Sequence, residues 1–272
     1  MNKFFRQPQG FVGAGILAFL AVIVLFGAAI APYEPSEFHA ASRLQGPSAA
    51  FLLGTDQFGR DILSRLLHGA RSTILFGVFA TSLGTFFGTL LGVTSGYLGG
   101  RLDNLIMRSI DGVIAIPDLL FALLIVTVLG GGAGHAMLAV AIAFTPGMAR
   151  ISRSATLSVR TREYVQAAIA RGEGRLYIIG REMLPNVLAP VIVEASIRVS
   201  FAVMLGATLG FLGLGAQPPS SEWGLMIAEA RSFMFRNAFT VLWPGLGIAL
   251  VAIGFNLAGD ALRDALNPRV RG

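Results

Sequence analysis

The side chains that most often bind metals or act as nucleophiles are rare in this sequence. It contains no Cys, and its three His residues, His39, His68 and His135, lie far apart in the chain. Thiol chemistry needs Cys, and a zinc site needs several ligands at close spacing. We find no pair of carboxylates arranged for acid–base catalysis. The sequence therefore gives no support to an enzyme or to a metal site, and we expect no cofactor.

A nucleotide-binding loop is also missing from the chain. The phosphate-binding sequence G-x-x-x-x-G-K-[ST] does not occur in it, so the chain cannot bind ATP through such a loop. If ATP drives any process here, a separate protein must hydrolyse it.

The segment 150–185 combines charge with a regular apolar pattern. It carries seven Arg and three Glu, and its apolar positions recur every three or four residues on either side of Gly172 and Gly174. The positions with this spacing are Tyr164, Ala167 and Ala168, with the charged Arg171 next in the row, then Leu176, Ile179 and Met183. The spacing predicts two short amphipathic helices joined by a bend. An ordinary solvated loop is the alternative, but an apolar stripe facing water usually binds a partner.

The elements that must position this segment are apolar. The chain is 54% hydrophobic and 13% charged, with a mean hydropathy of +0.70, whereas soluble domains are about 25% charged. Apolar runs recur to residue 259, so the first is expected to stay as an anchor rather than to be a removed signal peptide. A membrane span needs about 20 residues. Six spans are predicted: 11–31, 74–98, 105–129, 134–149, 187–214 and 240–260. Pro117 interrupts the third, and the fourth is short.

The distribution of positive charge predicts the orientation. Six spans put both termini on one side, and placing the N-terminus inside assigns most of the 21 Lys and Arg to the cytoplasm. Arg60, Arg65 and Arg71 run against this bias. The net charge of +6 is better explained by orientation than by nucleic-acid binding. We expect an all-α protein in the cytoplasmic (inner) membrane, with N-terminus, C-terminus and segment 150–185 inside.

Two charged pairs are predicted at the membrane. Arg108 and Asp111 share a helix face at i, i+3 spacing, and we expect either a contact with a partner protein or an ion pair at the membrane entry. Glu194 and Arg198 lie within the fifth span at i, i+4 spacing. Ionisable residues in a membrane face a bundle interior or water, and we favour pairing between these two over a place on the translocation path.

The outer loop before the second span carries a further charged cluster. Its members are Asp56, Arg60, Asp61 and Arg65. We expect a short helix on the outer surface, with these charges in water and its apolar side chains in the interface. Those side chains are Ile62, Leu63, Leu66 and Leu67. We treat this segment as structural.

Glycines mark two further elements. A row of small residues on the second span predicts a face that another helix approaches closely: Gly77, Gly84, Gly88, Gly92 and Gly96. After the fifth span, GFLGLGAQPPS and a helix over 222–235 are expected outside, where they either contact a partner protein, cover a pore as a lid, or form a simple external loop.

The segment 150–185 resembles the cytoplasmic loop of binding-protein-dependent ABC importer permeases. That pattern runs Glu-Ala-Ala, three residues, Gly, nine residues, an apolar position, one residue and Leu-Pro. The departures are Gln166 in place of Glu and Glu182 in place of the apolar residue. The matching residues are Gln166, Ala167, Ala168, Gly172, Leu184 and Pro185.

Four other stretches strengthen the resemblance and extend it to about residues 50–270. They are similar to the C-type permease subunit of dipeptide and oligopeptide importers: LGTDQFGRDILSRLLHGAR (53–71), GGRLDNLIMRSIDGVIAIPDLL (99–120), GFLGLGAQPPSSEWGLMIAEAR (210–231) and WPGLGIALVAIGFNLAGDALRDALNPR (243–269).

The resemblance implies the type I ABC importer permease fold and a set of partners. In that family two permeases form the pore, two cytoplasmic ATPases bind to the short helices of the loop, and an extracytoplasmic binding protein delivers the substrate. The residues expected at the ATPase-coupling loop are Tyr164, Gln166, Ala167, Ala168, Gly172, Leu176, Leu184 and Pro185. The resemblance also implies an N-terminal anchor with its outer loop (1–69) and a permease domain (70–272).

Other functions stay open at this point. Among substrates, peptides come first, and nickel complexes, opines or glutathione are alternatives. A different class is an ion-driven secondary transporter, which would have unpaired acids at mid-membrane and two inverted halves. Glu194 lies within a predicted span but has Arg198 beside it, which favours the ATP-driven importer.

Overall fold

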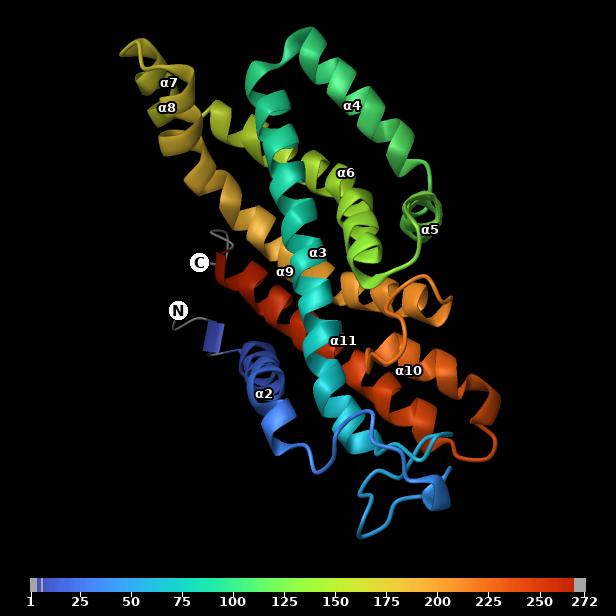
Figure 1. Ribbon diagram of the computed structural model, residues 1–272. Helices are drawn as coiled ribbons and strands as arrows, with labels where there is room; N and C mark the ends of the chain where they lie inside the picture. The colour runs from blue at the N-terminus through green and yellow to red at the C-terminus, as the bar shows by residue number, and fades with distance from the viewer. Residues whose placement is uncertain (1–3, 6, 267–272) are drawn as a thin grey trace.

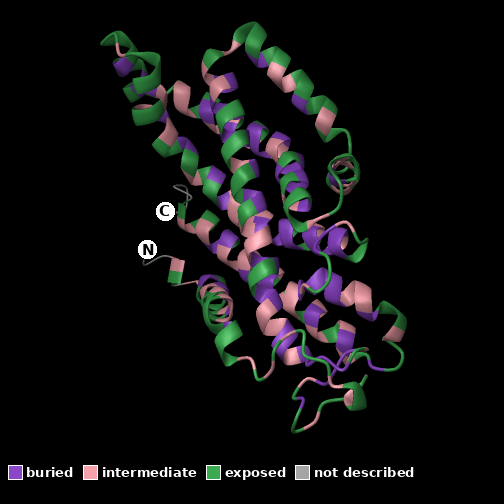
Figure 2. Ribbon diagram, viewed as in Figure 1, coloured by how far each residue is buried: buried purple, intermediate pink, exposed green. Residues whose placement is uncertain are grey.

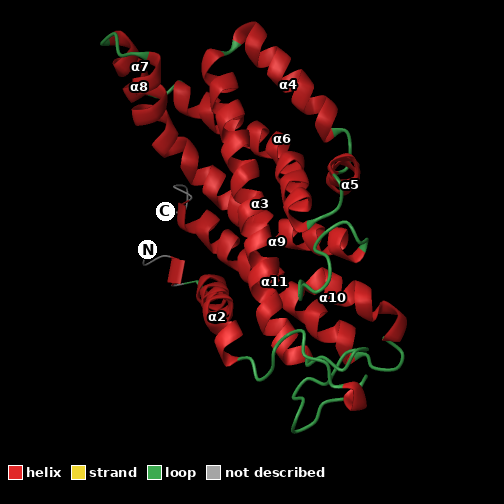
Figure 3. Ribbon diagram, viewed as in Figure 1, coloured by secondary structure: helices red, strands yellow, loops and turns green. Residues whose placement is uncertain are grey.

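In the computed structural model, which describes residues 4–5 and 7–266, the regular elements are helices, with one isolated bridge between Thr55 and Asp61 (Figure 3). The long helices are α2 (Pro8–Ile30), α3 (Ile62–Leu98), α6 (Ala133–Arg160), α9 (Leu184–Phe211) and α11 (Phe239–Leu266) (Figure 1). The shorter helices are α4 (Gly100–Ile114), α5 (Asp118–Leu129), α7 (Glu163–Ala170), α8 (Arg175–Tyr177) and α10 (Trp223–Ala230).

The third predicted span is broken rather than continuous. In the described part of the chain, five helices are long and apolar enough to cross a membrane, and α4 and α5 together give a sixth that is bent by 92°. The break lies at Pro117, which has no amide hydrogen to donate and disfavours a helical conformation in the residue before it. The prediction of a span over 105–129 is therefore corrected to two helices that meet at a corner.

The packing of α3 on α6 supports counting this bent pair as one crossing. Gly84 lies against Ala141, and Gly96 lies against Thr156, so the two helices run in the same direction. The chain between two parallel helices must return to its starting side. Helices α4 and α5 make this return, and the chain then has six crossings.

The glycines of α3 let these helices approach closely, as the sequence predicts. A Cβ atom on Gly92 would lie 2.3 Å from the carbonyl oxygen of Ala149, and one on Gly77 would lie 2.4 Å from a methyl group of Val203 on α9. Neither distance is possible for a real side chain. The glycine face of α3 is thus used for contacts within this chain.

Helix α2 packs against α11 in the opposite direction. Gly10 lies against Ala261 and Gly13 against Ala258, so the start of α2 meets the end of α11. The start of α2 and the end of α11 therefore lie on one side of the bundle (Figure 1), as expected for six crossings.

Many apolar side chains remain on the outside of the helices. Figure 2 shows exposed positions along α2, α4 and α5, among them Leu25, Leu105 and Val128, which are 72%, 66% and 78% exposed. An apolar exterior of this extent is typical of a surface covered by lipid or by another subunit.

Candidate coupling site

The bend predicted in segment 150–185 forms a helical hairpin at one end of the molecule (Figure 1). Helix α7 ends at Ala170. Gly172, just beyond it, adopts φ +79°, a conformation that glycine reaches without steric cost. The amide of Gly172 donates to the carbonyl oxygen of Ile169 at 2.9 Å, and that of Glu173 donates to Ala168 at 3.2 Å. These bonds close the helix end and turn the chain back toward the membrane.

A small apolar cluster holds the two arms of the hairpin together. Val165 and Ala168 of α7 are fully buried against Ile178 and Met183 of the returning arm. Ala168 thus packs inside the hairpin and offers no surface to a partner. Its small side chain lets the arms approach each other, so its contribution to a coupling surface is indirect.

The other predicted coupling residues lie mainly on the surface of the hairpin. The side chain of Leu176 at the tip is 87% exposed. Gln166 is exposed and donates from Nε2 to the carbonyl oxygen of Arg160 at 2.9 Å. Tyr164, Ala167, Gly172 and Pro185 are exposed as well, and Leu184 is half-buried.

The returning arm is not a separate helix, in contrast to the prediction. Helix α8, a π-helical stretch (Ile178–Met183) and α9 form one helical run of 37 residues from Arg175 to Phe211. Pro185 cannot donate to the preceding turn, and the wider π-helical turns lie directly before it. The hairpin tip is therefore joined to a membrane span by continuous helix.

Ion pairs join α4 to α6 on the side of the bundle that carries this hairpin. The predicted pair of Arg108 with Asp111 is wrong. Asp111 pairs with Arg150 of α6 at 2.5 Å rather than with Arg108. Asp103 binds Arg153 of α6 through two bonds of 2.6 and 2.5 Å. It also accepts the hydroxyl of Ser95. Local i, i+3 spacing gave no sign of these contacts, because the partners lie on another helix.

The predicted pair within the fifth span is confirmed. Nε of Arg198 donates to Oε1 of Glu194 at 3.1 Å. The guanidinium carbon lies 5.3 Å from the centre of the Phe144 ring, a favourable arrangement for a cation.

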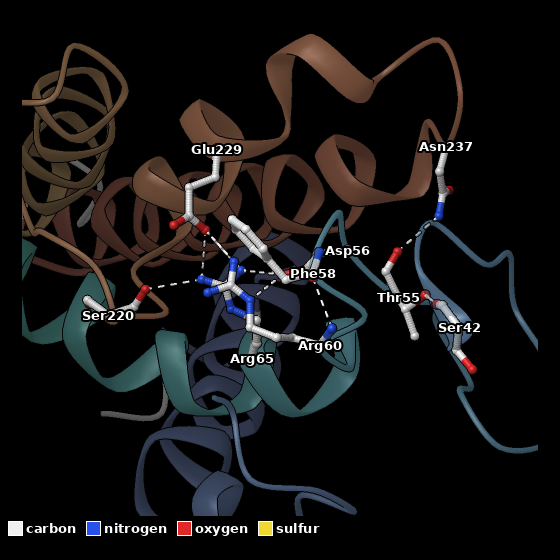
Figure 4. Close-up of polar contacts among 9 residues, drawn as sticks. All are labelled: Ser42, Thr55, Asp56, Phe58, Arg60, Arg65, Ser220, Glu229 and Asn237. Atoms are coloured by element: carbon white, nitrogen blue, oxygen red, sulfur yellow. Dashed lines mark hydrogen bonds and ion pairs between the residues drawn. The ribbon is translucent and has the colours of Figure 1, made fainter. Parts of the chain in front are cut away.

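At the opposite end, the charged side chains of the outer loop contact one another and α10 (Figure 4). Nε of Arg60 and Nη1 of Arg65 donate to Oδ2 of Asp56 at 2.6 and 2.8 Å. Glu229 of α10 accepts from Arg60 at 2.7 Å and from Arg65 at 3.1 Å. We call these four residues, Asp56, Arg60, Arg65 and Glu229, the outer ion network.

This network corrects the prediction of charges in water. Arg65 is 1% and Arg60 4% exposed, and Ile62 is buried in the start of α3 instead of lying in the interface. The carboxylate of Asp61 caps α3 by accepting from the amide of Ser64 at 2.7 Å. Two positive and two negative charges balance, which offsets the high cost of burying them.

Helix α10 closes over the outer end of α3 through further polar contacts. The indole nitrogen of Trp223 donates to the carbonyl oxygen of Leu66 at 3.0 Å.

Glu222 caps α10 by accepting from the amides of Gly224 and Leu225 at 2.9 Å. Burial nevertheless raises the pKa of the Glu222 carboxyl above its usual value. Nδ2 of Asn237, just after this helix, donates to the carbonyl oxygen of Thr55 at 3.2 Å (Figure 4) and to that of Gln45 at 3.1 Å.

Solved structures share this fold. The chain superposes on a structure described as inward-facing conformations of the MetNI methionine ABC transporter with a TM-score of 0.58 and 20% identity. The match covers 75% of this chain and 96% of the other. This likeness identifies the fold, which is that of a type I ABC importer permease.

Curated relatives resemble nearly the whole chain. A dipeptide transport system permease protein of Alkalihalophilus pseudofirmus is 43% identical over 98% of this chain and 88% of its own length. A di/tripeptide transport system permease protein of Pseudomonas aeruginosa is 42% identical over 98% and 90%. A glutathione transport system permease protein of Escherichia coli is 40% identical over 100% and 90%.

Two family models match complementary parts of the chain. Residues 1–47 match the N-terminal TM domain of oligopeptide transport permease C. Residues 88–272 match the binding-protein-dependent transport system inner membrane component. The chain is therefore a multi-pass membrane protein that belongs to the binding-protein-dependent transport system inner membrane component family, as a permease subunit of an ABC importer and not an enzyme in itself.

Proposed function

We propose that this chain forms half of the pore of an importer for di- and oligopeptides in the cytoplasmic membrane. A second, homologous permease would supply the other half, two cytoplasmic ATPases would bind below, and a binding protein would deliver peptide from outside. The peptide assignment is supported by relatives named for dipeptide, di/tripeptide and glutathione transport. The division of the chain at residues 69 and 70 stays a prediction, and α3 runs through it.

The uncovered hairpin carries the coupling part of the proposal. Leu176 exposes an apolar side chain at the tip of the hairpin, outside the predicted membrane spans. On α7, Tyr164 and Ile169 are 40% and 44% exposed and add further apolar area. Such a surface is stable when it is buried in a groove of another protein. The continuous helix behind Leu176 would then pass a displacement of the ATPase directly to α9.

The test is recovery of the ATPase with the purified complex. Changing Leu176 to Asp would place a charge in the apolar contact, and we expect at least about a tenfold loss of co-purifying ATPase. Leu52→Asp is the matched control, because Leu52 is 60% exposed in the loop at the opposite end. Equal ATPase recovery for Leu176→Asp and the unchanged chain would refute docking through this hairpin.

The substrate is tested in vesicles that contain the complete complex. We expect ATP- and binding-protein-dependent uptake of labelled dialanine and trialanine. Glutathione is the second candidate, favoured by the relative that is 40% identical over the whole chain. Uptake of glutathione, an opine or a nickel complex without uptake of either alanine peptide would contradict the peptide assignment.

A further inference from the structure

A cavity of about 300 Å³ lies where the α4–α5 corner meets α6 and α9. Its volume is at the lower end of the range for small-molecule sites, roughly 300–1,000 Å³. Most of its wall is apolar, including Ile114, Phe121 and Ile151, but Asp118, Arg150 and Arg198 also line it. Charged side chains of both signs therefore border one small cavity.

Arg198 lies deep in the membrane. It is near the middle of α9, roughly 20 Å from either end at 1.5 Å per residue. Charged side chains at this depth are costly, and they usually mark a path for a polar substrate. The pair with Glu194 neutralises the charge but does not explain why Arg198 also reaches the cavity.

The surroundings of Arg198 leave its guanidinium group available. Among the described residues it donates one side-chain hydrogen bond, from Nε to Glu194. The N–H groups of Nη1 and Nη2 are therefore free to donate to a ligand. Gly147 of α6 makes the room for these nitrogens, because a Cβ atom there would lie 2.6 Å from Nη2. A planar group with two such donors matches the two oxygens of a carboxylate.

The other charged groups of the cavity complete a zwitterionic pattern. Arg150 is already paired with Asp111. Asp118 is exposed and takes part in no ion pair within residues 4–5 and 7–266. The cavity thus offers one free acid and one free pair of guanidinium nitrogens, separated by apolar wall.

We propose that this cavity is a transit site for peptide termini. Arg198 binds the C-terminal carboxylate, Asp118 binds the N-terminal ammonium group, and the apolar wall contacts the peptide side chains. The inference rests on the proposed peptide transport and adds to it the residues that contact the peptide inside the membrane.

The test compares peptides that differ in one charged end. In vesicles holding the complete complex, uptake of dialanine and of dialanine C-terminal amide is measured for the unchanged chain and for Arg198→Gln. For each chain we take the ratio of dialanine uptake to amide uptake. One binding protein delivers both peptides to both complexes, so its own selectivity affects the two ratios equally. We expect Arg198→Gln to lower dialanine uptake about tenfold and to change amide uptake little.

Three further variants separate binding from folding. The double change Glu194→Gln and Arg198→Gln leaves no unpaired carboxylate in the membrane and should show the same selective loss. Asp118→Asn should lower dialanine uptake while leaving uptake of N-acetyl-dialanine unchanged. Arg263→Gln is the control, because Arg263 of α11 lines a different cavity. This change should leave the uptake of dialanine relative to either blocked peptide unaltered.

The outcomes distinguish this inference from the function on which it rests. If the unchanged complex takes up none of these peptides, the peptide function fails and this site fails with it. Suppose instead that the unchanged complex transports dialanine, but the Arg198 variants lower the uptake of dialanine and of its amide by the same factor. Arg198 is then structural, and only the transit site is refuted.

Discussion

At the scale of single residues, the outer ion network shows that burial decides the importance of a charged pair. Asp56 and Arg65 have side chains that are 5% and 2% exposed, whereas those of Asp111 and Arg150 are 59% and 54% exposed. Removing one partner from a buried pair leaves a charge without compensation, which costs far more than the loss of an exposed pair.

Glu229→Gln tests this difference. The change leaves Arg60 and Arg65 with one carboxylate between them, and we expect a loss of about 3 kcal/mol or more in the free energy of unfolding. Asp111→Asn should cost less than about 1 kcal/mol. Denaturant unfolding of both variants in the same detergent gives the comparison, and losses of equal size would contradict the assignment of the network as a stabilising contact.

At the scale of helices, close packing between α3 and α6 depends on glycine at defined positions. In a helix interior, Gly→Ala normally stabilises by roughly 1 kcal/mol, because alanine has the higher helix propensity. A Cβ atom on Gly15 of α2 would point into open space, with no neighbouring helix within 4 Å of it. A Cβ atom on Gly92 would instead meet both Ala149 and Ser152 of α6.

The same substitution should therefore have opposite effects at these two glycines. Gly15→Ala is expected to leave the midpoint of thermal unfolding unchanged or slightly higher. Gly92→Ala should lower it by several degrees, since α3 and α6 must separate to admit the methyl group. A Gly92→Ala variant as stable as Gly15→Ala would show that the two helices are less closely packed than the distances indicate.

Helices also show how far sequence patterns reach. The glycine row of α3 and the pair of Glu194 with Arg198 are periodic features within one helix, and both were predicted. The partner of Arg65 was not, because Glu229 is 164 positions away and nothing local marks it. Pro117 signalled a disturbance, but its local effect cannot tell a kinked helix from a corner of 92°.

At the scale of the whole molecule, one helical run joins the two ends of the protein. It begins at the hairpin tip and ends where Gly210 of α9 packs against Glu222 and Gly224 at the outer end. The outer ion network in turn ties α10 to the loop before α3. The proposed transit site lies on the same run, at Arg198, so a rigid α9 would link ATPase docking to the peptide path.

Weakening the helix between the hairpin and the span tests this link. Changing both Asn186 and Leu188, near the start of α9, to Gly costs about 1 kcal/mol of helix propensity at each position. We expect the ATPase to stay bound, because the hairpin is intact, while peptide transported per ATP hydrolysed falls severalfold. Changing both residues to Ala removes the same side chains but keeps the helix, and should preserve that ratio. Equal ratios for the Gly and Ala variants would mean that coupling does not pass through this part of α9.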